Sequence, residues 1–298
     1  MNKINRQSLI YTLSAVFLWS TVATAFKISL RGMNHAQLLF FASLASTVAL
    51  GFFSIRKISF ASLFSVKSVL LGFINPFVYY MLLFLAYSLL PAQEAQPLNY
   101  TWPIVLSLFA VLFLGEKMTI KKIVGLLFAF TGVIIIATRG SLSSLEFDNL
   151  KGIIVALSTS LVWGAFWILN IKDNRSNIIK LFTAFFYGTL FSGIYLFVFD
   201  SFKIEAPVYI LGAVYVGLFE MGITFLLWNK GLELSKDRTI TSTFAYLSPF
   251  LSLLFIALIL GEKIKFSSIL GLMLIVGGIL YQNFSKGKRQ TTASNLKN

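Results

Sequence analysis

Long apolar stretches separated by short polar connections run through most of this chain of 298 residues. Each stretch has about 20 residues, which is the length that an α-helix needs to cross the hydrocarbon core of a bilayer. Glycines and prolines within the stretches favour helices over the alternating strands of a membrane barrel. We therefore expect an all-α integral membrane protein with ten spans, near residues 8–29, 35–55, 67–89, 93–114, 119–138, 151–171, 178–199, 207–229, 239–260 and 266–284.

The composition agrees with a lipid environment. Hydrophobic residues make up 57% of the chain and charged residues only 12%, about half the usual share in a soluble domain. The first apolar stretch is too long for the core of a signal peptide, so we interpret it as the first span. The chain has no cysteine, which excludes disulfides and thiolate metal sites.

The basic residues predict the orientation of the spans. With the N-terminus inside, 18 of the 25 lysines and arginines fall in the inner segments, and this bias places both termini in the cytoplasm. The net charge of +14 is spread between spans and does not gather on one element, so we expect the lipid bilayer as a partner and no nucleic acid.

Two stretches end on the same residues, Gly115-Glu116-Lys117 and Gly261-Glu262-Lys263. Other positions match in nearly the same register. At offsets of 144 to 146 residues the matched pairs are Trp19 with Trp163, Gly72 with Gly217, Asn75 with Glu220, Tyr100 with Tyr246, Pro103 with Pro249, Gly125 with Gly271, and Gly132 with Gly278. This register indicates a duplication. We expect five-helix repeats at 1–145 and 146–285 and a disordered cytoplasmic tail at 286–298.

The odd number of spans in each repeat places the second copy upside down relative to the first. Two opposed halves can rock about a central site and expose it to each side in turn, which is a transporter architecture. The sequence therefore predicts a secondary transporter that works by alternating access. The two Gly-Glu-Lys ends are expected at the bilayer surface, where they mark the register and take no part in the chemistry.

The repeated pattern resembles the drug/metabolite transporter superfamily, specifically its EamA-type members. The matching features are a tryptophan in the first span of each half (Trp19, Trp163), the Leu-Leu-Pro end of the third span, and the proline and Gly-Glu-Lys ending of the fourth span. The resemblance covers nearly the whole chain. It implies a multi-pass protein of the bacterial inner membrane with a small organic molecule as substrate.

A narrower likeness concerns "LNYTWP" at residues 98–103, which resembles the fourth span of aromatic amino acid exporters in this family. In those exporters a tyrosine and a tryptophan line the central cavity. The resemblance assigns Tyr100 and Trp102 to substrate binding, with Trp163 and the pair Tyr79-Tyr80 as looser matches, and it implies export of aromatic or other neutral amino acids.

Polar residues recur along one face of the span near 93–114. Gln96, Tyr100 and Pro103 are spaced by three or four residues, so this face either lines a cavity or packs against another helix. Tyr246 lies on the matching face of the span near 239–260.

The two prolines in these spans interrupt the helical hydrogen bonding. Pro103 and Pro249 each release a carbonyl one turn earlier, so each is a candidate hinge or a static kink. Tyr100 and Trp102 would reach one cavity only if the helix bends at Pro103.

Glu220 lies in the middle of a span, where a charge at the bilayer centre costs about 2.5 to 3.5 kcal/mol on insertion scales. It is expected to bind a substrate ammonium group or carry a coupling proton, or else to share a hydrogen bond with Asn75, its repeat counterpart.

Aromatic residues gather at membrane interfaces by default. Trp19, Trp163 and Trp167 fall at mid-span and are therefore expected in a cavity, whereas Trp228 and Tyr281 lie near span ends and are expected to be interface anchors. Aromatic walls with a few polar groups suit amphipathic organic solutes and can attract an ammonium group.

Two other functions compete with amino acid transport. Uptake or exchange of a nucleotide-like or other charged metabolite would require basic groups inside the spans, and there are almost none. An intramembrane enzyme would need clustered Asp, His or a nucleophile, whereas the four aspartates are isolated and His35 is the only histidine. No glycine-rich phosphate loop is present, and no cofactor or metal is expected. The oligomeric state is left open.

Overall fold

The computed structural model describes residues 5–54, 58–141, 148–171 and 173–283, and the predicted disordered tail lies outside this range. Regular structure in the described part is entirely helical, as expected. The α-helices are α1 (Arg6–Ser29), α2 (His35–Ser54), α3 (Phe60–Leu63), α4 (Val66–Gly72), α5 (Tyr79–Leu89), α6 (Ala92–Asn99), α7 (Trp102–Leu114), α8 (Ile120–Ala137), α9 (Leu150–Ile171), α10 (Asn177–Phe199), α11 (Val208–Val216), α12 (Ile223–Leu234), α13 (Arg238–Thr243), α14 (Ser248–Phe255) and α15 (Phe266–Asn283). Four wider or tighter turns join some of them: the π-helical η1 (Phe73–Val78), η2 (Gly217–Gly222) and η4 (Ile256–Leu260), and the 3₁₀ segment η3 (Phe244–Leu247).

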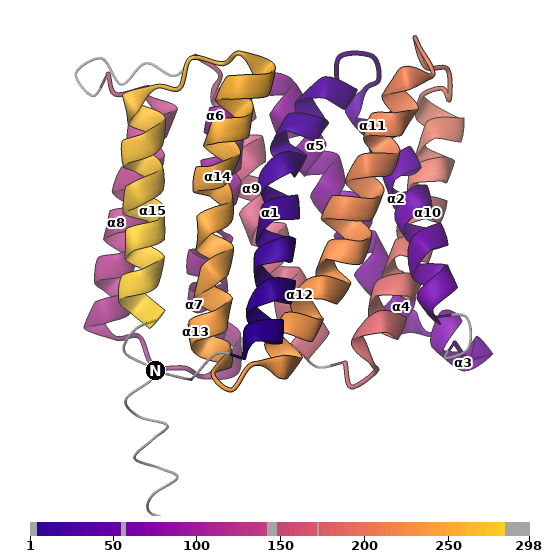
Figure 1. Cartoon of the computed structure of the whole chain (residues 1–298), viewed down its shortest axis with the longest axis horizontal. Helices are drawn as coiled ribbons and strands as arrows, with labels where there is room; N and C mark the ends of the chain where they lie inside the picture. The colour runs from indigo at the N-terminus through magenta and orange to yellow at the C-terminus, as the bar shows by residue number, and fades with distance from the viewer. Residues whose placement is uncertain (1–4, 55–57, 142–147, 172, 284–298) are drawn as a thin grey trace, which may run out of the picture.

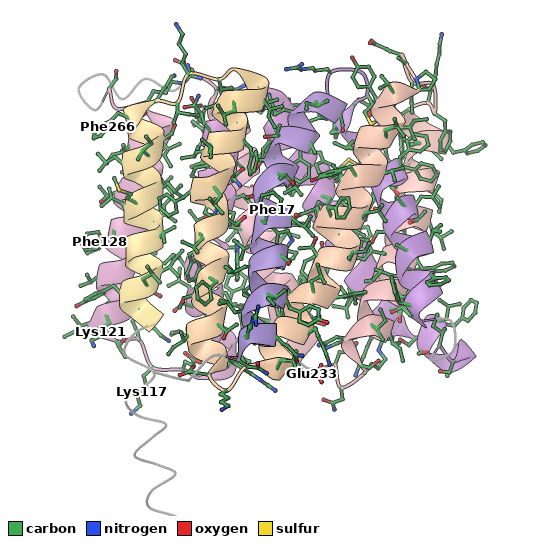
Figure 2. All side chains as sticks on the ribbon, viewed as in Figure 1. Phe17, Lys117, Lys121, Phe128, Glu233 and Phe266 are labelled. Atoms are coloured by element: carbon green, nitrogen blue, oxygen red, sulfur yellow. The ribbon has the colours of Figure 1, made fainter. Side chains whose placement is uncertain are left out.

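These helices assemble into spans close to those predicted. Within the described residues, nine helical stretches are long and apolar enough to cross a bilayer, and a tenth, Phe266–Gln282, is shorter by the same measure. Large apolar side chains such as Phe17, Phe128 and Phe266 point outward along the height of the bundle, while Lys117, Lys121 and Glu233 lie at one end of it (Figure 2). This distribution is what a lipid-facing belt with charged ends requires.

The two repeats are interleaved in space. The first span, α1, packs mainly on α11, α12 and α14 of the second half, and its counterpart α9 packs on α5, α6 and α7 of the first half. The helices α2 and α10 pack on each other, as do α8 and α15 (Figure 1). This reciprocal pairing is that of two inverted five-helix repeats, in agreement with the sequence prediction.

The pair α8 and α15 is held by glycines at matched positions. A Cβ atom on Gly132 would lie 2.6 Å from the carbonyl oxygen of Gly271, and one on Gly125 would lie 2.6 Å from that of Gly278. Small residues at such contacts let two membrane helices approach at backbone distance, where dispersion forces hold them together.

Polar contacts tie α2, α4 and α10 together at the two ends of the bundle. At the upper end in Figure 1, Asn34 donates to Asp200 at 2.8 Å and Gln37 donates to the carbonyl of Ser201 at 2.9 Å. At the lower end, Arg175 forms an ion pair with Asp173 at 2.6 Å and donates to Ser68 at 2.5 Å. Burial acts to raise the pKa of Asp173, but the hydrogen bonds from Arg175 outweigh it and hold that pKa below its usual value.

Candidate functional site

A cavity of about 900 Å³ lies between the two repeats. Its wall is formed mainly by α1, α4 to α5, α6 to α7, α9, α10, η2 to α12 and α13 to η3. Its lower part includes Glu116, Lys122, Asn177, Lys180 and Leu232, which belong to the end where α1 begins (Figure 1). Its upper part ends at Phe26 and Tyr87. The cavity is thus open at one end of the bundle and closed at the other.

The backbone is irregular where the third and eighth spans reach the cavity. Asn75 leaves helical geometry with φ −145° and ψ 117°, directly before Pro76. In the other repeat, Gly222 has φ −113° and ψ −95°, two residues after Glu220. Both Asn75 and Glu220 lie on the cavity wall. Widened π-helical turns are frequent at functional sites because they turn side chains and carbonyls out of the regular ladder.

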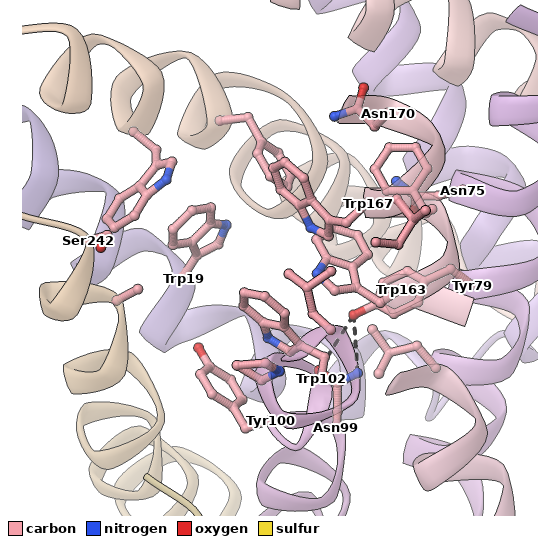
Figure 3. Close-up of a pocket in the computed structure, with 18 of the residues that line it drawn as sticks. Trp19, Asn75, Tyr79, Asn99, Tyr100, Trp102, Trp163, Trp167, Asn170 and Ser242 are labelled. Carbon is pink, nitrogen blue, oxygen red and sulfur yellow. Dashed lines mark hydrogen bonds between the residues drawn. The ribbon is translucent and has the colours of Figure 1, made fainter. Parts of the chain in front are cut away.

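The fourth span breaks between α6 and α7, one turn before Pro103. Proline cannot donate to the carbonyl of Asn99, and that carbonyl accepts instead from Ser160 Oγ of α9 at 2.9 Å. The Asn99 amide donates to Thr159 at 2.8 Å and to the Tyr79 hydroxyl at 3.1 Å. The break is therefore fixed against α9, and it allows both Tyr100 and Trp102 to line the cavity (Figure 3).

Aromatic rings form a large part of the wall. Trp163 lies 4.6 Å from Tyr79 and 6.2 Å from both Trp102 and Trp167, measured between ring centroids. Trp19 approaches from the opposite side of the cavity (Figure 3), with its ring 5.3 Å from that of Trp228. The cavity therefore offers several aromatic faces at different orientations, which suits a flat apolar group.

Most residues predicted for substrate binding lie on this wall: Trp19, Asn75, Tyr79, Gln96, Tyr100, Trp102, Trp163, Trp167, Glu220 and Tyr246. Tyr80 does not; it is only 1% exposed, and its hydroxyl donates to Glu220 at 3.2 Å from behind the wall. Of the two candidate hinges, Pro103 lies on the wall, whereas Pro249 is buried in the packing of α14. Asn75, the alternative partner expected for Glu220, is not hydrogen-bonded to it in the described part of the chain, and Tyr80 takes that place.

Several polar atoms of the wall are without a hydrogen-bond partner among the described residues. They are two indole N–H donors, Trp163 Nε1 and Trp167 Nε1, and two amide acceptors, Asn75 Oδ1 and Gln96 Oε1. A buried polar group without a partner costs about 1 to 3 kcal/mol. The four residues line the cavity, but these four atoms are covered by neighbouring atoms, so a ligand pairs with them only after the covering side chains move.

Asn99 and Trp228 are among the wall residues that the sequence interpretation missed. Asn99 precedes Tyr100 and is not on the polar face that the spacing identified. It reaches the cavity where the helix breaks before Pro103. Trp228 was expected to be an interface anchor, which is wrong: it lines the cavity beside Trp19. The widened turn η2 rotates α12 relative to α11, so position along the span did not reveal the direction of this side chain.

Comparison with known proteins decides the family. The model of the EamA-like transporter family matches residues 6–138 and again residues 150–284. This chain belongs to the EamA-like transporter family. The double match agrees with the duplication seen in the sequence.

Relatives of this EamA-like transporter are named as transporters. It is 28% identical to the aromatic amino acid exporter YddG of Escherichia coli over 286 residues, which are 90% of this chain and 94% of that protein. It is 25% identical to the uncharacterized transporter YvbV of Bacillus subtilis over 226 residues, 74% of this chain and 72% of that one. A solved crystal structure covers 98% of this chain and 99% of its own with a TM-score of 0.65 and 20% identity, which shows a shared fold.

Proposed function

We propose that this EamA-like transporter carries neutral amino acids, aromatic ones above all, across the bacterial inner membrane by alternating access. This proposal includes two repeats at residues 1–145 and 146–285 and both termini in the cytoplasm. It also includes the ten wall residues as the substrate site, with Tyr80 supporting them from behind. The observation that carries it is the set of unpaired polar atoms beside an acidic side chain on an aromatic wall.

The polar atoms match the head group of an amino acid. An α-carboxylate needs hydrogen-bond donors, and Trp163 Nε1 and Trp167 Nε1 are donors without partners among the described residues. An α-ammonium needs acceptors, and Asn75 Oδ1, Gln96 Oε1 and the Glu220 carboxylate are acceptors on the same wall. Once the side chains that cover these atoms move aside, pairing both charges satisfies them and offsets the cost of removing the zwitterion from water.

The remaining wall fits the side chain of an aromatic amino acid. Trp19, Tyr100 and Trp102 present ring faces to the cavity (Figure 3), and offset or edge contacts between rings contribute about 0.5 to 1.5 kcal/mol beyond the area they bury. The exporter YddG, a relative by sequence, has aromatic amino acids in its name. Both arguments favour an aromatic substrate over a charged metabolite.

The open end of the cavity is compatible with export. By the distribution of lysine and arginine, the end that carries Lys122 and Lys180 faces the cytoplasm, and the cavity is open at that end. In this state substrate can load from the cytoplasm, as export requires, while the substrate and coupling gradients set the direction of net transport.

Flux measurements in proteoliposomes test this proposal. Labelled phenylalanine and tryptophan are compared with a labelled nucleoside monophosphate and a labelled lipophilic cation, with protein-free liposomes as the control. We expect saturable flux of both amino acids and none of the other two. Flux of the nucleotide alone would refute the proposed substrate and favour the exchange-carrier alternative.

A further inference from the structure

The closed end of the cavity is built around the short connection between α5 and α6. Only Leu90 and Pro91 separate the two helices, so the last carbonyls of one and the first amides of the other are exposed side by side, and both need partners. Lys27 of α1 donates to the carbonyl oxygens of Tyr87 and Leu90 at 2.9 and 3.1 Å. A cation on helix C-terminal carbonyls is favourable for the helix dipole.

Glu262 supplies the opposite charge to the start of α6. The amide of Ala92 donates to Glu262 Oε1 at 2.9 Å and the amide of Gln93 donates to Glu262 Oε2 at 3.3 Å. The N-cap residue of α6 is Pro91, whose side chain makes no capping hydrogen bond. The cap therefore comes from the other repeat, 170 residues away along the chain, and a carboxylate at a helix N-terminus is a favourable arrangement.

Further contacts extend this closure above and below Glu262. Above it, the Gln93 side chain donates to the carbonyl of Lys263 at 3.0 Å and accepts from the amide of Lys265 at 2.7 Å. Below it, the ring of Phe26 lies 5.1 Å from that of Tyr87 and 5.0 Å from that of Phe84. Phe26 and Tyr87 thus end the cavity, and the hydrogen bonds of Glu262 and Gln93 join the two repeats at the same end of the bundle.

The repeat-related glutamate at the open end has a different environment. Gly115 and Gly261 end their helices with nearly identical backbones, φ 70° and ψ 16° against φ 71° and ψ 16°. Yet Glu116 lines the cavity and pairs at 2.8 Å with Lys122 of its own repeat. The helix related to α6 by the repeat, α13, is capped by its own Asp237, which accepts from the Ile240 amide at 3.0 Å.

We propose that Glu262 is the latch of the closed gate: its carboxylate must release the α6 amides before the cavity can open at this end, and it biases the carrier toward the state open at the other end. At the other end α13 carries its own cap, Asp237, so its first amides do not depend on Glu116. The Gly-Glu-Lys ending therefore only reveals the repeat in the first half of the chain, whereas in the second half its glutamate is part of the gate. This proposal rests on the alternating access of the proposed function and is independent of the substrate.

Thiol accessibility tests the latch, and the cysteine-free chain makes the readout clean. A single reporter, Leu83→Cys, introduces a thiol on the buried upper wall of the cavity. A membrane-impermeant methanethiosulfonate is added to right-side-out or inside-out vesicles without any substrate. In the otherwise unchanged chain, labelling should come predominantly from the side of Lys122.

With Glu262→Ala, labelling from the side of Glu262 should rise by about 2-fold to 30-fold, which corresponds to the usual effect of losing a helix N-cap. Glu262→Gln retains one acceptor oxygen and should give a smaller rise. Glu116→Ala is the matched control and should leave the labelled side unchanged.

Two outcomes would overturn the proposal. One is unchanged sidedness in a Glu262→Ala protein that remains monodisperse with the melting temperature of the parent. The other is an equal change in Glu262→Ala and Glu116→Ala, which would indicate general loosening. Because no substrate is present, a wrong substrate in the flux assay leaves this test unaffected.

Discussion

Replacing Glu220 distinguishes two possible roles of this residue: contact with the ammonium group of the substrate and support of the cavity shape. Glu220→Gln keeps the size of the side chain and an oxygen that can accept the hydrogen bond from Tyr80, which measures 3.2 Å, but it removes the negative charge. A hydrogen bond to a charged group contributes about 1.5 to 3 kcal/mol. We expect phenylalanine to bind about 10-fold to 150-fold more weakly to the variant.

The assay is a thermodynamic cycle over protein and ligand. Dissociation constants for phenylalanine and for 3-phenylpropanoate, which lacks the ammonium group, are measured by titration calorimetry in detergent for the unchanged chain and for Glu220→Gln. The variant should lose affinity for phenylalanine and change by less than about 2-fold for 3-phenylpropanoate, because only the first ligand can pair with the carboxylate.

Two results would refute this reasoning. Equal losses for both ligands would mean that Glu220 supports the shape of the cavity and does not contact the ammonium group. Unchanged affinity together with unchanged transport at every pH would remove both roles expected for Glu220, substrate contact and proton carrier.

Three further outcomes follow from the geometry. Trp163→Phe keeps a ring but removes an indole donor to the charged carboxylate, so phenylalanine should bind about 10-fold to 150-fold more weakly in the same titration. Phenethylamine, which lacks a carboxylate, should be unaffected, and equal losses would contradict the carboxylate contact. The pKa of Asp173 is lowered in the folded protein, so its pairing with Arg175 stabilises the fold at pH values above the unfolded pKa of about 3.9, and this contribution is lost as pH falls through the lower folded pKa. The melting temperature should therefore fall below about pH 4. Asp173→Asn should lower the melting temperature at neutral pH and remove that part of the acid dependence. Gly132→Leu should lower the melting temperature, because an added Cβ would lie 2.6 Å from the facing carbonyl oxygen of Gly271 and would force α8 away from α15. Gly277→Ala should leave the melting temperature unchanged, because its Cβ would have no neighbour within 4 Å. Equal effects would contradict the glycine contact.

The spans and their inversion could be predicted because both depend on patterns local to the sequence. Hydrophobic length defines a span, and the register from Trp19 to Gly278 revealed the duplication without any knowledge of contacts. The same register placed Asn75 opposite Glu220, and the structure has irregular backbone at or beside both.

Side-chain direction within a span could not be predicted in the same way. Tyr79 and Tyr80 are adjacent, and only the rotation of α5, set by its packing on α9 and η1, decides that Tyr79 reaches the cavity and Tyr80 supports Glu220 from behind. Trp228 was misjudged for a similar reason, since η2 rotates the helix before it. The contact of Glu262 with α6 joins residues 170 positions apart, and no local pattern indicates such a cap.

The most direct test of the proposed substrate site is a crystal structure with 4-bromophenylalanine, located by the anomalous signal of bromine. A single bromine peak inside the cavity of about 900 Å³, with the carboxylate at Trp163 and Trp167 and the ammonium group at Glu220, is the predicted result. Saturating ligand with no bromine in this cavity, or with bromine only elsewhere on the protein, would contradict it.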